Sequence, residues 1–183
     1  MQRVNIVGTS GSGKTTFAKK LATQLNCACI EMDALFWKPN WQESKDEEFF
    51  SLLEQHLEQE KWVLDGNYHR SRALKWRNVD TIIWLDFSFT RTLFQACRRA
   101  LTRSLNKTEL WGKTGNVESF RRSFFSKESV LLWTIKTHAS NHHRYQTLMS
   151  ASEYRHIHFV RLTSPKMADK WLQHLDTGST FPP

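Results

Sequence analysis

The alternation of apolar and polar positions divides the chain into short apolar runs separated by amphipathic stretches. Runs rich in β-branched and aromatic residues predict strands at 3–7, 28–32, 61–65, 81–85 and 156–160. Apolar residues at helical spacing predict helices at 17–25, 44–58, 89–101, 128–149 and 167–175. Strands that alternate with helices favour a parallel sheet covered by helices on both faces. We therefore predict a three-layer α/β fold in which residues 1–183 form a single domain.

The first predicted strand leads directly into a glycine-rich motif. Residues 8–15 read G-T-S-G-S-G-K-T and match the phosphate-binding pattern G-x-x-x-x-G-K-[ST]. A strand before the motif and a helix after it are the setting of a P-loop NTPase; an ordinary Gly/Ser-rich turn is the alternative. Backbone N–H groups and the helix N-terminus would bind phosphate, Lys14 would reach the β- and γ-phosphates, and Thr15 would ligate Mg²⁺. We expect Mg-ATP to be bound by Gly8, Ser10, Gly11, Ser12, Gly13, Lys14, Thr15 and Thr16.

Three acidic residues follow predicted strands, at the sheet edge where parallel sheets bind their ligands. Asp65 ends an apolar strand, so we expect it to hold Mg²⁺ with Thr15; a cap of the next turn is the alternative. Asp86 precedes a predicted helix and is expected to cap it or to support the site from behind. Asp33 stands where an acceptor would bind, as a base that takes a proton from a hydroxyl or as a simple turn residue.

Residues 33–60 form the expected acceptor-binding segment. Trp37 and Trp41 lie four positions apart and could stack on a ring, although core packing is the commoner role of such residues. Ser44 and Glu47 form a capping-box pattern that opens the helix of this segment. The residues expected at the substrate are Asp33, Trp37, Trp41, Asp65 and Arg70.

A basic stretch follows the fourth predicted strand, and residues 104–127 carry Gly112 and Gly115. This composition predicts a lid that closes over the triphosphate and supplies arginines to the transferring group. A solvated basic face is the alternative. The residues expected to take part in catalysis are Lys14, Asp33, Arg98, Arg99 and Arg103, and the sequence does not distinguish the three arginines.

The composition indicates which classes of partner this protein could bind. A formal net charge of +8 suits an anionic partner, which includes nucleotides, phosphorylated metabolites and nucleic acid. No helix-turn-helix, zinc-finger or RNA-binding signature is present in the sequence. No apolar run is long enough for a transmembrane helix, and a strand is predicted almost at Met1, so we expect a cytoplasmic monomer without membrane contact. His138 and His142 have a spacing that zinc could use, but a solvated basic helix face is the preferred interpretation.

Several blocks together resemble the adenylate-kinase-related P-loop proteins that are often labelled DNA topology modulation proteins. The resemblance extends over nearly the whole chain. It rests on G-T-S-G-S-G-K-T at 8–15, M-D-A-L-F-W at 32–37, W-V-L-D-G-N-Y at 62–68 and D-T-I-I-W-L-D at 80–86, and the segments 109–116 and 125–129 are similar to the family as well.

The resemblance implies the nucleoside monophosphate kinase fold, with five parallel strands in the order 2-3-1-4-5 and a lid after the fourth. In adenylate kinases the third strand ends D-G-x-P-R, and the arginine holds the acceptor phosphate. Here Asp65 and Gly66 match, whereas Tyr68 and His69 replace the proline and the arginine and Arg70 comes one position late. The cysteines of zinc-binding lids are also absent from the sequence. The identity of the acceptor therefore stays open.

These features favour an ATP-dependent kinase that transfers the γ-phosphoryl group to a small nucleotide or metabolite. Two alternatives remain. The basic charge is compatible with a nucleic-acid-associated NTPase or regulator of the DNA topology modulation type, and the phosphate-binding motif alone is compatible with an ATP-dependent sensor.

Overall fold

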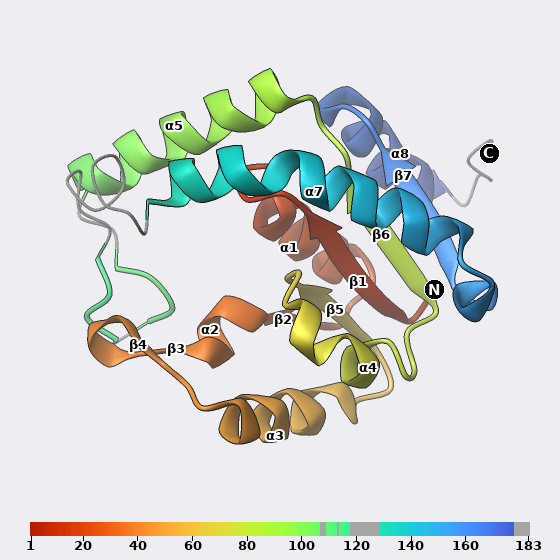
Figure 1. Ribbon diagram of the computed structural model, residues 1–183. Coiled ribbons are helices and arrows are strands. Elements are labelled where there is room, and N and C mark those ends of the chain that lie inside the picture. Colours follow the sequence, from red (N-terminus) through yellow and green to blue (C-terminus); the bar gives the residue numbers. More distant parts are fainter. Residues whose placement is uncertain (107–108, 113, 118–128, 178–183) are drawn as a thin grey trace.

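The computed structural model describes residues 1–106, 109–112, 114–117 and 129–177. Its centre is a five-stranded sheet in which every strand pairs in parallel with its neighbours (Figure 1). The predicted α/β class is therefore confirmed, and the last strand lies two residues later than the sequence predicts. From one edge to the other the strands are β2 (Ala28–Glu31), β5 (Trp62–Asp65), β1 (Arg3–Gly8), β6 (Thr81–Leu85) and β7 (His158–Leu162).

The strand numbers read 2-5-1-6-7 and differ from the order 2-3-1-4-5 that the resemblance implies. The difference arises from a separate antiparallel hairpin, β3 (Trp37–Lys38) and β4 (Gln42–Glu43), which the sequence does not predict. Strands of two residues are too short to produce a detectable alternation. Counted among the strands of the large sheet alone, β5, β6 and β7 are the third, fourth and fifth along the chain.

Helices connect the strands and cover the sheet. None of the helices within the described ranges is both long and apolar enough to cross a lipid bilayer. The α-helices are α1 (Lys14–Gln24), α2 (Met32–Phe36), α3 (Asp46–Leu57), α4 (Arg72–Lys75), α5 (Phe89–Asn106), α7 (Val130–Ser150) and α8 (Pro165–Thr177). Single 3₁₀ turns occur at Pro39–Trp41, His69–Ser71 and Ser152–Tyr154.

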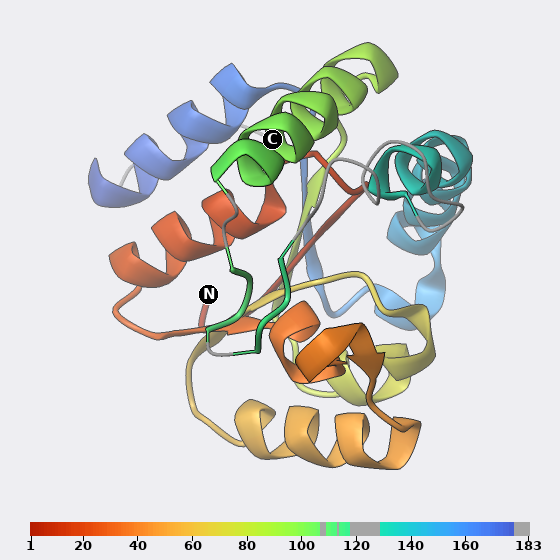
Figure 2. The same cartoon turned by 90° about the vertical axis from the view of Figure 1, so that its left-hand side faces the viewer.

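The two faces of the sheet form two separate apolar cores, because successive side chains of a strand point to opposite faces. In β5, Trp62 and Leu64 join the core under α3 and α7, whereas Val63 joins the core under α1 and α8. Figure 2 shows these layers edge on, with α1 and α8 on one side of the sheet and α7 on the other. Strands covered on both faces are nearly continuous apolar runs, which is why the sequence located them.

The start of α3 differs from the expected capping box. The helix begins at Asp46 with Lys45 as its N-cap, and no side chain caps it. Ser44 instead donates a hydrogen bond to the carbonyl oxygen of Leu35, at 3.3 Å, and is buried beside the β3–β4 hairpin. The acidic residues of the first turn still favour the helix through its macrodipole.

The expected lid at 104–127 is described in part. Its first residues continue α5 to Asn106, and residues 109–112 and 114–117 follow, joined by a bridge between Glu109 and Val117. The described residues of this segment lie beside the β3–β4 hairpin (Figures 1 and 2). Residues 107–108, 113 and 118–127 of the expected lid lie outside the described residues.

Candidate functional site

The glycine-rich loop lies between β1 and α1, at the carboxyl edge of the sheet. Gly8, Gly11 and Gly13 have φ angles of 146°, 86° and 89°, which side chains with a Cβ rarely adopt. Their surroundings differ. A Cβ on Gly11 would lie 2.8 Å from the Cβ of Ala96 in α5, whereas a Cβ on Gly13 would meet no atom within 4 Å. The loop is therefore packed against α5 on one side and open at Gly13.

Lys14 folds back across this loop. Its Nζ donates a hydrogen bond to the carbonyl oxygen of Thr9 at 3.0 Å. Burial lowers the pKa of Lys14, an effect that Asp65 opposes and Arg99 reinforces, while Asp33 also opposes it. The ammonium group thus lies within the field of two carboxylates and one guanidinium group. Thr16, also expected at the nucleotide, is exposed.

Thr15 and Asp65 meet as the sequence suggests. The Thr15 hydroxyl donates a hydrogen bond to Asp65 Oδ2 at 2.5 Å, although the two residues are fifty positions apart. Asp65 is only 7% exposed, and burial raises its pKa, opposed by the Lys14 ammonium and the Thr15 hydroxyl. No described residue makes a hydrogen bond to Asp65 Oδ1, which is buried.

A buried carboxylate oxygen without a partner is costly unless a proton, a ligand, an ion or water satisfies it. The Ser12 hydroxyl, in the same loop, is likewise buried and has no partner among the described residues. Oxygen atoms of one carboxylate and one hydroxyl are what Mg²⁺ takes from a protein when phosphates supply further ligands. The donor set of Thr15 and Asp65 therefore fits a magnesium ion.

Asn67 also belongs to this edge, and the sequence analysis did not select it. Its amide donates a hydrogen bond to the Gly8 carbonyl at 2.7 Å and accepts one from the Gly8 N–H at 3.1 Å. The Tyr145 hydroxyl of α7 donates to the same amide oxygen at 3.1 Å. Asn67 thereby fixes the start of the loop. Its place directly after Asp65-Gly66 was the only sequence signal.

Of the three expected arginines, Arg99 reaches the loop. Its Nη2 donates a hydrogen bond to the Ser10 hydroxyl at 3.2 Å, and it lies on the face of α5 that packs on Gly11. Arg98 is exposed, and Arg103 is half-buried near the end of α5. The structure therefore shows that Arg99 contacts the loop whereas Arg98 faces solvent, a difference that the sequence did not reveal.

Asp33 lies in the first turn of α2, directly after β2. The Tyr68 hydroxyl donates a hydrogen bond to Asp33 Oδ1 at 2.7 Å, and the charge of Asp33 acts on both Lys14 and Asp65. The Asp33 carboxylate is exposed. It is thus an accessible acid at the same edge as the loop.

Trp37 and Trp41 pack edge to face, with ring centroids 5.7 Å apart, and Trp111 packs on Trp41 in the same way. Asn116 joins the two segments, because its amide oxygen accepts from the Trp41 N–H at 2.8 Å and its amide nitrogen donates to the Lys38 carbonyl at 3.0 Å. The described part of the expected lid therefore contacts the expected acceptor segment directly.

Arg70 does not stand free at the site. Its Nε lies 3.2 Å from Asp46 Oδ1 of α3, and its guanidinium group lies 4.8 Å from the centre of the Phe36 ring. Neighbouring His69 accepts a hydrogen bond from Arg144. Burial, reinforced by Arg144, lowers the pKa of His69 to about 4, so the ring is neutral at pH 7.

Lys75 is a second residue that sequence reasoning missed. It is 1% exposed, and its Nζ donates hydrogen bonds to the carbonyls of Gly66 and Asn67 at 3.2 and 2.6 Å. Burial, reinforced by Arg72, lowers the pKa of Lys75 to about 7. Lys75 therefore supports the turn that carries Asn67. A lysine near the end of a short helix gave no signal in the sequence.

Asp86 and the two histidines of α7 have structural partners. Asp86 lies 2.8 Å from His142 Nδ1 and accepts hydrogen bonds from Arg161 of β7, so it joins α7 to the sheet edge rather than capping α5. His138 Nε2 lies 3.0 Å from the Phe87 carbonyl oxygen. Within the described ranges, no group of three or more His, Cys, Asp or Glu side chains is placed to hold a metal ion.

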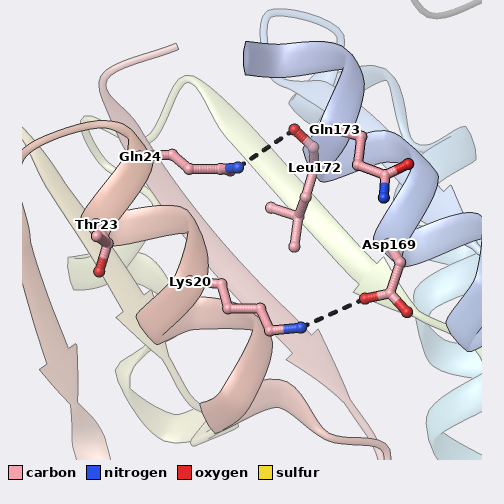
Figure 3. Close-up of a pocket in the computed structure, with 6 residues that line it drawn as sticks. All are labelled: Lys20, Thr23, Gln24, Asp169, Leu172 and Gln173. Atoms are coloured by element: carbon pink, nitrogen blue, oxygen red, sulfur yellow. Dashed lines mark hydrogen bonds and ion pairs between the residues drawn. The ribbon is translucent and has the colours of Figure 1, made fainter.

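A separate groove lies between α1 and α8 (Figure 3). Lys20 and Asp169 approach to 3.5 Å across it, and Gln24 donates to the Leu172 carbonyl at 3.4 Å. None of the loop residues lines this groove. Comparison with known proteins adds no assignment, because no family model and no curated protein matches this chain.

Proposed function

We propose that this protein is a P-loop kinase that transfers the γ-phosphoryl group of Mg-ATP to a small acceptor. The observation that carries the proposal is the hydrogen bond between Thr15 and Asp65 in the field of Lys14. The second oxygen of Asp65 is buried and accepts no hydrogen bond from the described residues. Phosphoryl transfer depends mainly on positioning and on neutralising phosphate charge. A glycine loop, an ammonium group and a magnesium-compatible oxygen pair provide both.

The fold supports the same proposal. The loop follows the central strand β1, and the helix after it begins at Lys14 with its N-terminus at the same sheet edge. Anions bind well at such a terminus because its backbone N–H groups are free and the helix macrodipole is positive there. The arrangement is the one expected of a P-loop NTPase fold.

The residues would have separate roles in binding phosphate and in holding Mg²⁺. Loop N–H groups would bind phosphate oxygens, Lys14 would leave the Thr9 carbonyl to bind the β- and γ-phosphates, and Arg99 would add positive charge beside Ser10. Thr15 and Asp65 would hold Mg²⁺, which would neutralise phosphate charge during transfer.

The test is a transfer assay with ATP labelled at the γ-phosphate, the full chain, Mg²⁺ and a panel of nucleoside monophosphates, nucleosides and small metabolites. We expect label to appear in at least one acceptor. Lys14→Ala should lower that transfer by at least about 100-fold, because one phosphate-binding donor is removed. Asp65→Asn should lower it too and should weaken its dependence on Mg²⁺.

Lys20→Ala is the matched control, because Lys20 lies on the same helix but pairs with Asp169 of α8. It should transfer label within about twofold of the wild-type rate, in keeping with the small contribution of an exposed ion pair. ATP binding without transfer to any acceptor would contradict the kinase and favour a sensor. Equal losses in Lys14→Ala and Lys20→Ala would contradict the phosphate-binding role of the loop.

A further inference from the structure

We infer that the acceptor presents a neutral hydroxyl group rather than a phosphate, and that Asp33 takes the proton of that hydroxyl. This inference rests on the proposed function, which leaves the acceptor open. It assigns Asp33 a catalytic task and excludes nucleoside monophosphates as the main substrates.

The first argument is the position of Asp33. The residue lies in the first turn of α2, two positions after β2 ends, at the same sheet edge as the loop, and its charge acts on the Lys14 ammonium and on Asp65. Tyr68 fixes one carboxylate oxygen at 2.7 Å. The other oxygen, Asp33 Oδ2, accepts no hydrogen bond from the described residues, and the side chain is exposed. A base needs such a fixed, accessible oxygen near the reacting group.

The second argument is the state of the nearby cations. A phosphate acceptor needs cations to offset its repulsion from the carboxylates of Asp33 and Asp65. Arg70 shares its charge with Asp46 in an ion pair whose side chains are 43% and 51% exposed, and its guanidinium group lies over Phe36. Neighbouring His69 is neutral because its pKa is lowered to about 4. His69 therefore offers no positive charge to an acceptor phosphate, and Arg70 offers one that Asp46 partly offsets.

The third argument is the chemistry of the surrounding surface. Tyr68 and Trp37 are half-buried and pack against Phe36 with ring centroids 5.2 and 5.1 Å apart. Phe36 itself is only 5% exposed, so Tyr68 and Trp37 provide the accessible aromatic surface. Aromatic faces bind rings and the C–H faces of sugars, and they do not compensate charge. An uncharged hydroxyl compound with a ring, such as a nucleoside or a sugar, suits this surface better than a phosphate.

The reaction balances as follows. The acceptor oxygen forms a bond to the γ-phosphorus of ATP while its proton passes to the Asp33 carboxylate. The bond between the γ-phosphorus and the bridging oxygen breaks, and ADP leaves with the electron pair. The products are a phosphomonoester, ADP and protonated Asp33, which returns its proton to water.

The experiment uses paired acceptors that differ by one phosphate, such as adenosine with its 5′-monophosphate and thymidine with its 5′-monophosphate, together with free sugars as a second hydroxyl source. We expect transfer to hydroxyl compounds without the phosphate. Asp33→Asn keeps the shape and the oxygen that accepts from Tyr68 but removes the base, so kcat should fall about 10²–10⁴-fold. ATP affinity, measured by titration with a fluorescent analogue, should stay within about threefold.

Glu31→Gln is the matched control. It removes the same charge two residues earlier, from a side chain that pairs with Lys19 at 2.7 Å, and should leave kcat within about twofold. Lys14-dependent transfer to monophosphates alone, or full activity of Asp33→Asn, would overturn the inference and leave the kinase standing. Absence of both transfer and Lys14-dependent ATP binding would overturn the proposed function as well.

Discussion

Gly11 and Gly13 form a pair of test positions within one loop. Both have positive φ angles, 86° and 89°, so a Cβ strains the backbone at either position. At Gly11 the added Cβ would also lie 2.8 Å from the Cβ of Ala96 and 2.8 Å from the carbonyl oxygen of Thr92. At Gly13 it would meet no atom within 4 Å. The two alanine variants therefore separate backbone strain from collision with α5.

The expected magnitudes follow from these contacts. The left-handed conformation costs an L-residue about 1–2 kcal/mol, which applies to both variants. Overpacking adds about 1–3 kcal/mol where the neighbours must move, which applies only at Gly11. We therefore expect the free energy of unfolding to fall by about 2–5 kcal/mol in Gly11→Ala and by about 1–2 kcal/mol in Gly13→Ala.

Urea unfolding followed by tryptophan fluorescence measures this difference, since the chain has eight tryptophans. With an m-value of about 1–3 kcal/mol per molar, the two midpoints should differ by about 1 M. ATP affinity should show a different order of effects. Gly13→Ala should lose at least about tenfold in affinity despite its smaller loss of stability, because its Cβ enters the open side of the loop. Equal destabilisation of the two variants would refute the packing of α5 on Gly11.

Three further outcomes are expected. Lys75→Met should reduce the pH dependence of stability. Because the native pKa of Lys75, about 7, lies below the unfolded value, the native state binds fewer protons between about pH 7 and 10, and the free energy of unfolding of the wild type should rise with pH in this range. The rise should be smaller in the variant, which urea midpoints at pH 7 and 9 would show. Asn67→Ala should cost about 1–3 kcal/mol in the same assay, because both backbone groups of Gly8 lose a partner, and ATP affinity should fall; unchanged values would contradict the role of this amide. Asp86→Ala should lower the free energy of unfolding by about 2 kcal/mol or more in a thermal unfolding assay without changing ATP affinity, since its carboxylate bonds to Arg161 of β7 and His142 of α7 rather than to loop residues.

The sheet and the loop could be predicted because their signals are local. Each strand of the large sheet contains a short run rich in β-branched, aromatic or other apolar residues, most continuous in β5 and β6, and the motif at 8–15 is contiguous. The hairpin of Trp37–Lys38 with Gln42–Glu43 carries no periodicity, since each strand has two residues. Ser44 shows the limit of a local pattern. The sequence contains a capping box, but the Ser44 hydroxyl donates its hydrogen bond to the Leu35 carbonyl instead of capping α3.

The site could be predicted as a set of residues but not as a set of contacts. The proximity of Thr15 and Asp65 could be predicted because the carboxyl ends of parallel strands lie at one edge of the sheet. The pairing of Arg70 with Asp46 depends on how the start of α3 lies against the turn after β5, which no pattern encodes. Asn67 was missed for the same reason, as its partner Gly8 is fifty-nine positions away.

Ser10 connects the loop to both helices that flank the expected lid. Arg99 of α5 donates to its hydroxyl at 3.2 Å, and Thr134 of α7 donates to its carbonyl at 3.2 Å. If a polyphosphate bound here and reoriented the loop, it would also change the contacts that α5 and α7 make with Ser10. The same coupling runs in reverse, because a contact that favours one loop conformation also favours the helix positions that go with it. Gly11, directly after Ser10, brings this part of the loop against α5, where an added Cβ would lie 2.8 Å from the Cβ of Ala96, so a change in the loop at Ser10 is expected to be felt by α5.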